Sequence, residues 1–102
     1  MYLPAQSTRT GYVQVMDRKE DKLRRWASEH FNSNERYRIL RDSNSIRLRV
    51  AILSPRAKDL LLKLHADVFP TFTKPEPSLQ ESGEWIAGFG FSEPPTHYVR
   101  IQ

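Results

Sequence analysis

Arginine alternates with apolar residues in two short segments that a polar turn separates. Residues 36–41 read Arg-Tyr-Arg-Ile-Leu-Arg, and residues 46–53 read Ile-Arg-Leu-Arg-Val-Ala-Ile-Leu. A period of two is typical of a β-strand with one apolar and one polar face, and the Asp-Ser-Asn-Ser sequence between the segments favours a turn. The two segments therefore predict a β-hairpin.

The hairpin places its arginines on one face. Closing it on a two- or four-residue loop pairs Ile39 with Leu48 and sets Arg38 opposite Arg49. Like charges directly opposite each other destabilise a sheet by a fraction of about 1 kcal/mol, so a sequence that keeps them favours an anion as partner. The alternative is that these side chains form the solvated face of a one-sided antiparallel sheet. The predicted binding residues on this face are Arg36, Arg38, Arg47 and Arg49.

The rest of the chain divides into elements by periodicity and turn signals. Asp17 and Glu20 have capping-box spacing, and Leu23, Trp26 and Ala27 continue a helical apolar stripe. Ser54 and Pro55 favour the start of a second helix, which Pro70 ends. The predicted segments are an irregular arm (1–11), a strand (12–16), a helix from Asp17 to 32–34, the hairpin, a helix to Phe69, a Pro-rich loop (70–83) and strands at 85–91 and 97–101.

This order predicts an α+β fold in a single domain spanning residues 1–102. Strand, helix, two strands, helix and strand match a ferredoxin-like split βαβ sandwich with one extra C-terminal strand. In that arrangement an antiparallel sheet carries two helices on one face and leaves the arginine face open. The apolar hairpin residues then pack under the helices.

Aromatic residues and glycines alternate in the segment 85–91. Trp85, Phe89 and Phe91 share one face with Ala87, and the two glycines lie on the other. The aromatic side chains complete the core in one interpretation, and the glycines then permit close backbone approach. In the other interpretation the aromatic side chains face outward as a stacking or docking surface.

Composition excludes several classes of protein. With 38% hydrophobic residues the chain is globular, and it has no cysteine for a disulfide or thiolate site. No apolar run approaches the length of a membrane span, and the N-terminus lacks a secretion signal. We expect a cytoplasmic protein with no cofactor and no membrane partner.

Catalysis has little support in the sequence. The three histidines lie in separate predicted elements without metal-ligand spacing, and no phosphate loop or nucleophile motif is present. His97 and Tyr98 with Arg100 form the one set that a metal-independent ribonuclease would need. We therefore predict no catalytic residues and no metal site, with ribonuclease activity as the enzymatic alternative.

Charge favours a binding function. Residues 36–63 hold eight of the 16 basic residues but only two of the 12 acidic ones, in a chain of net charge +4. Open sheet faces bind single-stranded nucleic acid when they carry cations and aromatic platforms, and Tyr12 is the candidate stacking residue beside the arginines. We predict contact with a nucleic acid backbone, single-stranded or RNA. The alternative is an inhibitor or adaptor that docks on an acidic surface of another protein, such as a nucleic-acid-handling machine.

Overall fold

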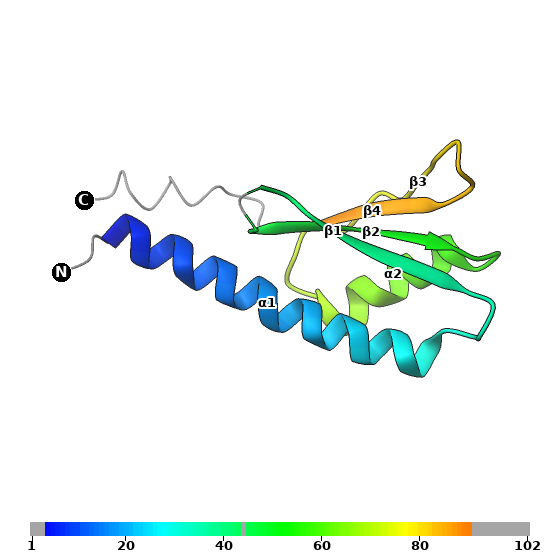
Figure 1. Ribbon diagram of the computed structural model, residues 1–102, viewed down its shortest axis with the longest axis horizontal. Helices are drawn as coiled ribbons and strands as arrows, with labels where there is room; N and C mark the ends of the chain where they lie inside the picture. Colours follow the sequence, from blue (N-terminus) through cyan, green and yellow to red (C-terminus); the bar gives the residue numbers. More distant parts are fainter. Residues whose placement is uncertain (1–3, 44, 91–102) are drawn as a thin grey trace.

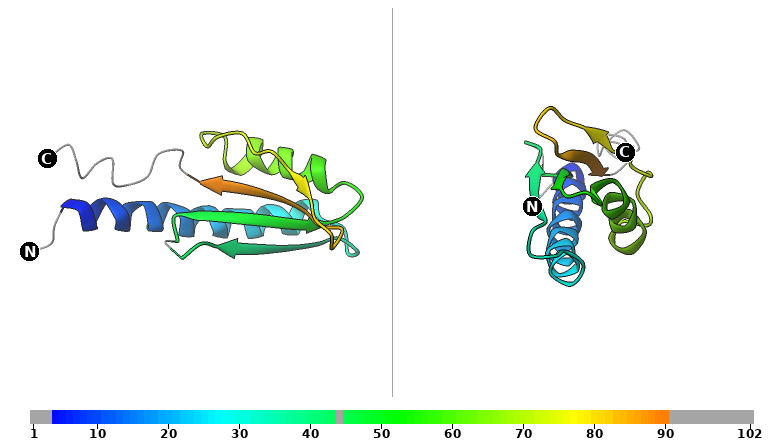
Figure 2. Two further views of the ribbon diagram at one scale, coloured as in Figure 1. Left: turned by 90° about the horizontal axis from the view of Figure 1, so that it is seen from above. Right: turned by 90° about the vertical axis from the view of Figure 1, so that its right-hand side faces the viewer.

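The computed structural model describes residues 4–43 and 45–90 and gives these residues an α+β architecture. Their elements are α1 (Pro4–His30), β1 (Arg36–Arg41), β2 (Arg47–Leu53), α2 (Ala57–Val68), β3 (Ser78–Leu79) and β4 (Trp85–Gly90). The strands form an antiparallel sheet in the spatial order β1-β2-β4-β3. Both helices lie on the same side of the sheet (Figure 1 and Figure 2), so the predicted class and the one-sided arrangement are confirmed.

Helix α1 differs most from the sequence-based prediction. It occupies residues predicted as an irregular arm (4–11) and as a strand (12–16). Met16, Leu23 and Trp26 are buried, and their spacing of seven and three residues places them on one side of a helix. The apolar run at 12–16 is too short for its period to distinguish a strand from a helix. Its continuity with the helical stripe determines the outcome, and both predictions were wrong.

Asp17 consequently lies inside α1 and does not cap its start. The side chain of Arg41, at the end of β1, donates a hydrogen bond to Asp17 at 3.2 Å and another to Glu20 at 2.9 Å. Carboxylates three residues apart share one side of a helix, so both reach the same guanidinium group. The two carboxylates whose spacing resembled a capping box therefore connect α1 to the sheet through Arg41.

The element order is not the ferredoxin-like one. Because a helix stands where the first strand was expected, the described chain follows the order α-β-β-α-β-β. The ferredoxin-like sandwich is therefore not confirmed. The strand predicted at 97–101 lies outside the described residues.

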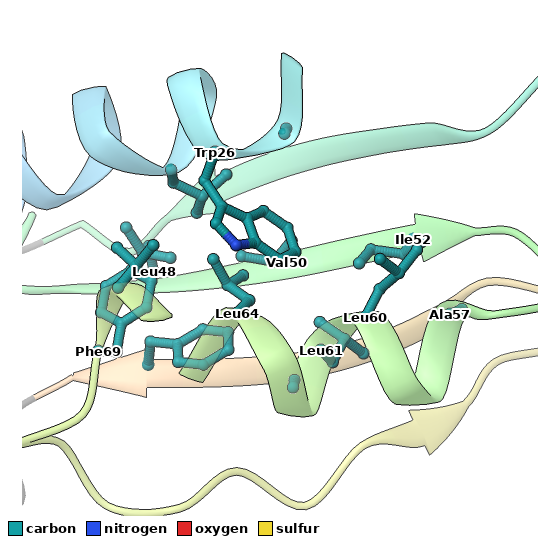
Figure 3. Close-up of a cluster of buried hydrophobic side chains, with 14 of the residues drawn as sticks. Trp26, Leu48, Val50, Ile52, Ala57, Leu60, Leu61, Leu64 and Phe69 are labelled. Atoms are coloured by element: carbon teal, nitrogen blue, oxygen red, sulfur yellow. The ribbon is translucent and has the colours of Figure 1, made fainter. Parts of the chain in front are cut away.

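The hydrophobic core lies between the sheet and the two helices (Figure 3). Leu48, Val50 and Ile52 point from β2 into this core, as the alternation predicted. Trp26, which belongs to the predicted stripe of the first helix, is 6% exposed, so its prediction as a core-facing residue is confirmed. Leu61 of α2 is 0% exposed and lies in the same core.

The hairpin forms with a register two residues away from the predicted one. Arg38 pairs with Ala51, and Arg49 pairs with Leu40, so the two arginines are diagonal neighbours and not directly opposite. Ser45 adopts a φ of 62°, and the loop extends to include Ile46, which is buried. A shift of two residues preserves the faces of a sheet. The predicted register was wrong, but the predicted division into faces is confirmed.

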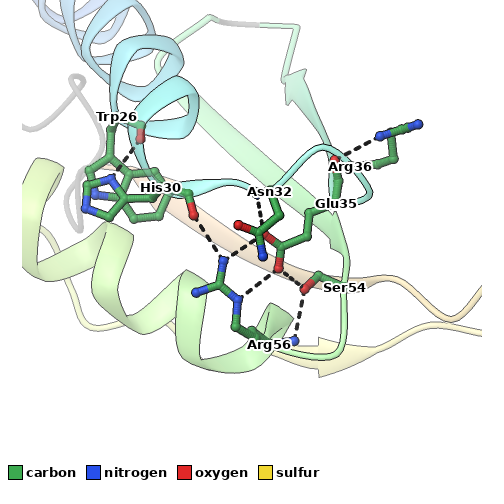
Figure 4. A network of polar contacts seen from close by, with 7 residues as sticks. All are labelled: Trp26, His30, Asn32, Glu35, Arg36, Ser54 and Arg56. Atoms are coloured by element: carbon green, nitrogen blue, oxygen red, sulfur yellow. Dashed lines mark hydrogen bonds and ion pairs between the residues drawn. The ribbon is translucent and has the colours of Figure 1, made fainter.

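A polar network fixes one end of the sheet to both helices (Figure 4). The buried carboxylate of Glu35 accepts hydrogen bonds from Arg56 at 2.7 and 2.9 Å, from the Asn32 N–H at 2.7 Å and from the Ser54 hydroxyl. These bonds, led by those from Arg56, lower the pKa of Glu35 to about 2. Arg56 also donates to the carbonyl of His30, at the end of α1. The network therefore joins the end of α1, the end of β2 and the start of α2.

The segment 70–83 is more ordered than a simple loop. It contains β3, whose Ser78 and Leu79 pair with Ile86 and Trp85 of β4. Pro75, which precedes β3, is buried. The proline-rich segment therefore runs beside the sheet and adds a short edge strand to it.

Candidate nucleic-acid interface

The outer face of the sheet, which points away from both helices, collects the predicted arginines. Arg36 and Arg38 reach it from β1, and Arg47 and Arg49 reach it from β2. All four residues are exposed. The structure thus agrees with the placement inferred from the alternating pattern, while their role in binding stays a prediction.

Tyr12 does not belong to this surface. It lies in α1, which packs against the opposite face of the sheet (Figure 2). The expectation that Tyr12 stands beside the arginines was wrong, because it depended on a strand at 12–16. Tyr12 therefore cannot act as a stacking group for a chain that follows the outer face.

The four arginines differ in their surroundings, which divide the outer face into two halves. We call the half formed by Arg38, Ala51 and Glu84 the closed half. Arg38 Nε and Nη2 donate to the two carboxylate oxygens of Glu84 at 2.8 and 3.0 Å. Because β2 lies between β1 and β4, the Arg38 side chain passes over β2 to reach Glu84. Ala51, its partner on β2, is only 1% exposed although it lies on the outer face. The ion pair therefore covers the sheet here.

Glu84 is held in place by more than Arg38. The Ser82 hydroxyl donates to Glu84 Oε1 at 2.9 Å, and the Glu84 carbonyl accepts the Gln80 N–H at 2.8 Å in the turn between β3 and β4. The hydrogen bond from Arg38, followed by that from Ser82, lowers the pKa of Glu84 to about 2. Glu84 is therefore ionised at neutral pH and positioned before any ligand arrives.

Arg36 lies at the rim of the outer face. Its Nη1 donates to the carbonyl oxygens of Ser33 at 2.7 Å and Glu35 at 3.2 Å. The side chain therefore folds back toward the loop before β1 (Figure 4), away from the middle of the sheet. Arg36 therefore lies apart from the other three arginines of the outer face.

The open half of the outer face consists of Arg47, Arg49, Gly88, Gly90 and the segment 73–76. The two arginines pair across the sheet with the two glycines. A Cβ atom placed on Gly90 would lie 2.5 Å from Arg47 Cγ, whereas one placed on Gly88 would lie 3.8 Å from Arg49 Cγ. The Arg47 stem thus uses space that only glycine leaves at position 90 of β4, whereas a Cβ atom at position 88 would lie at an ordinary contact distance from Arg49. The side chain of Arg49 makes no ion pair or hydrogen bond with any other described residue.

A cleft of about 490 Å³ opens on this half. Arg47 and Arg49 line it together with Lys74 from the proline-rich segment, and Asp42 and Glu76 contribute two carboxylates. Its charged lining therefore holds three cations and two anions. A volume in the range of roughly 300–1,000 Å³ is typical of ligand sites.

The aromatic side chains of Trp85 and Phe89 in β4 pack on the core side of the sheet, although Phe89 is also among the residues that line the cleft. The ring of Phe89 is buried and stacks on Phe69 with centroids 4.5 Å apart, and Trp85 is partly buried on the same inner side. This confirms the core interpretation for both residues, while Phe91 lies outside the described part of the chain. The outer face, as far as it is described, offers no aromatic platform for a base.

Three residues that contribute to the open half were missing from the predicted site: Lys74, Gly88 and Gly90. Lys74 lies in a segment without periodicity, so nothing in the sequence placed it near β2. Gly88 and Gly90 carried a partial signal, since their alternation with aromatic residues indicated close backbone approach. The group that comes close to Gly90 is instead the side chain of Arg47. The arginines that use this space could not be named, because the pairing of β2 with β4 is not encoded by a local pattern.

Each of the two histidines that the structure describes has a ring nitrogen at hydrogen-bond distance from a backbone carbonyl oxygen. His30 Nδ1 lies 2.8 Å from the carbonyl oxygen of Trp26, and His65 Nε2 lies 2.9 Å from that of Phe72. Among residues 4–43 and 45–90, no cluster of three or more histidines and carboxylates could hold a metal ion. His97, Tyr98 and Arg100 lie outside this range. The ribonuclease alternative is therefore untested.

Comparison with protein family models, with curated proteins and with solved structures found no match to this chain. In the described part of the molecule, no helix has the length and apolar composition that crossing a lipid bilayer requires.

Proposed function

We propose that this protein binds nucleic acid by contacting its phosphate backbone with the open half of the outer face. The observation that carries the proposal is the cleft of about 490 Å³ at which Arg47, Arg49 and Lys74 come together from two distant segments. Phosphate contacts of this kind position a nucleic acid without reading its sequence. Specific recognition of bases is not part of the proposal.

The chemistry of these side chains suits phosphate. A guanidinium group presents several N–H donors in a plane and can donate two of them to one phosphate. Arg49 would make such a contact without first breaking an internal ion pair, since it has none with the described residues. Lys74 adds a point charge from the other side of the cleft lining.

A flexible single strand fits this surface better than a duplex does. The cations lie around a recess between β2, β4 and the segment 73–76, so a chain has to bend into it to contact all three. Single strands bend easily, whereas a rigid duplex would contact only the rim. Phe89, the aromatic residue in the cleft lining, is only 1% exposed and offers little surface on which a base could stack. We therefore expect weak base preference and affinity that falls steeply with salt.

The test is a charge-neutralising double substitution, Arg47→Gln with Arg49→Gln. Fluorescence anisotropy with a labelled single-stranded homopolymer, measured over a range of salt concentrations, gives the slope of log K against log salt. The loss of two phosphate contacts should make this negative slope shallower by about 1.4, at about 0.7 per contact for single strands. Affinity should fall at least tenfold at the lowest salt concentration.

The matched control is Arg24→Gln with Arg25→Gln on the exposed side of α1. It changes the net charge by the same amount, and Arg24 pairs with Glu20 at 2.9 Å on the other side of the sheet. We expect the control to keep most of the affinity. Equal losses in both variants would mean that only net charge matters, and the site would then be wrong.

A second candidate function is docking on an acidic segment of another protein. The observation that favours it is the pair of carboxylates, Asp42 and Glu76, within the cleft. These groups repel a continuous phosphate chain, but they can accept hydrogen bonds from a peptide backbone. Binding of a labelled poly-glutamate peptide in the absence of oligonucleotide binding would support this function over the first.

A further inference from the structure

We infer that Glu84 competes with phosphate for Arg38. By pairing with Arg38, Glu84 confines the binding site to the open half of the outer face. This inference rests on the proposed function, because it concerns where that site ends. It also revises the role predicted for Arg38. In the folded protein Arg38 would be a brace across three strands and not a phosphate contact.

The geometry of the pair supports this assignment. Both carboxylate oxygens of Glu84 are bonded to Arg38, at 2.8 and 3.0 Å, which is the bidentate arrangement that a phosphate would otherwise take. The Glu84 side chain is 18% exposed, and that of Arg38 is 58% exposed. An incoming anion can therefore approach Arg38, but it has to displace a carboxylate that is less accessible than the arginine itself.

The turn before β4 keeps the carboxylate in place. Gly83 adopts a φ of +92°, and its N–H bonds to the carbonyl of Gln80 at 2.9 Å. Ser82 holds Glu84 from the side through its hydroxyl group. A displaced Glu84 would remain beside the incoming phosphate as a like charge. Both effects disfavour replacement of the internal carboxylate by an external anion.

Release of Arg38 would extend the open half by one cation. Arg38 pairs with Ala51, which lies two residues beyond Arg49 on the same face. Diagonal neighbours of this kind are within reach of long side chains. A freed Arg38 would therefore continue the row formed by Arg49 and Arg47, and a bound strand could make one more contact without changing its path.

The experiment compares Glu84→Gln with the wild type in the salt-dependence assay with the labelled homopolymer. The substitution keeps the shape of the side chain but removes the charge that holds Arg38. We expect affinity to rise several-fold and the slope of log K against log salt to steepen by about 0.7, which corresponds to one added contact on a single strand. Adding Arg38→Gln to Glu84→Gln should restore the wild-type slope.

The matched control is Glu81→Gln. It makes the same change in net charge in the same turn, at an exposed residue that has no partner among the described residues. Its slope should equal that of the wild type. Arg38→Gln alone should also leave the slope unchanged, and this variant tests the inference even if Glu84→Gln fails to fold.

The outcomes separate the inference from the proposed function. Equal slopes in Glu84→Gln, Glu81→Gln and the wild type would overturn the inference and leave the proposed function standing, as would a reduced slope in Arg38→Gln. Binding by Glu84→Gln but not by the wild type would support the role of Glu84 and refute the function of the unmodified protein. If neither protein binds, both are refuted.

Discussion

The closed and open halves of the outer face contain the same kind of residue in opposite states. Arg38 and Arg49 are diagonal neighbours on adjacent strands, and both are exposed. Arg38 is bound to Glu84, whereas Arg49 has no partner among the described residues. The difference arises at β4. Glu84 precedes this strand at one end of the face, whereas Gly88 and Gly90 lie toward its other end. The availability of an arginine is therefore decided by a neighbouring part of the sheet and not by its own segment.

The two halves rest on the same hydrophobic core, so a substitution in that core should unfold both together. We expect this substitution to have the largest effect. Leu61 is fully buried beneath the sheet. We expect Leu61→Ala to lower the free energy of unfolding by about 2–5 kcal/mol, because it removes buried methyl groups and leaves a cavity. Chemical denaturation measures this loss, and oligonucleotide binding should disappear in parallel with unfolding.

Leu79→Ala is the control for this prediction. Leu79 is 61% exposed on the short edge strand β3, so the same change in side chain should alter the free energy of unfolding by less than about 0.5 kcal/mol. Similar costs for the two substitutions would mean that α2 does not pack under the sheet as described.

A smaller effect should separate the two glycines of the open half. Gly90→Ala puts a methyl group 2.5 Å from Arg47 Cγ and 3.2 Å from Arg47 Cβ, so the arginine stem has to move. We expect a loss of about 1–3 kcal/mol in the free energy of unfolding, together with weaker oligonucleotide binding. In Gly88→Ala the new methyl group lies at an ordinary contact distance of 3.8 Å from Arg49, and both properties should change little. A larger binding defect in Gly88→Ala would reverse the roles assigned to the two arginines.

Much of the fold could be predicted from the sequence, since most elements carry a local period. The hairpin, the second helix and the strand at 85–91 were recognisable, and so was the burial of Trp26. The N-terminal region failed because five apolar-rich residues at 12–16 satisfy both a strand and a helix period. Continuity with the helical stripe resolves this ambiguity, since Met16 is buried in the same core as Leu23 and Trp26.

The sequence was sufficient to predict which face of the sheet carries the arginines. It was not sufficient to predict which residues each arginine contacts. Alternation is enough to place Arg38 and Arg49 on one side of a sheet. The register differs by two residues from the predicted one, and the loop between the strands includes Ile46. Glu84 is 46 residues away from Arg38, so only the order of the strands brings the two together. Lys74 likewise reaches the cleft through the arrangement of the elements in space and not through a local sequence pattern.

The smallest expected effect concerns the acid stability of the closed half. The pKa of Glu84 is lowered from an ordinary value of 4.5 to about 2 in the folded protein. A carboxyl group whose pKa is depressed on folding contributes stability that is complete above its unfolded pKa and is lost as the pH falls toward its folded pKa. The contribution of Glu84 should therefore be constant near neutral pH and decline between about pH 4.5 and pH 2.

The measurement is the difference in free energy of unfolding between the wild type and Glu84→Gln at several pH values. Glu35, whose pKa is also about 2, remains in both proteins, so its own titration cancels in the difference. The wild type should be the more stable protein at neutral pH, by a small amount because the Arg38 side chain is exposed to solvent and salt. Its advantage should shrink as the pH falls below 4.5 and should also shrink in high salt at neutral pH. A difference that stays constant from neutral pH down to about pH 2 would show that Glu84 does not hold Arg38 as an ion pair, and the closed half would then be as open as the other.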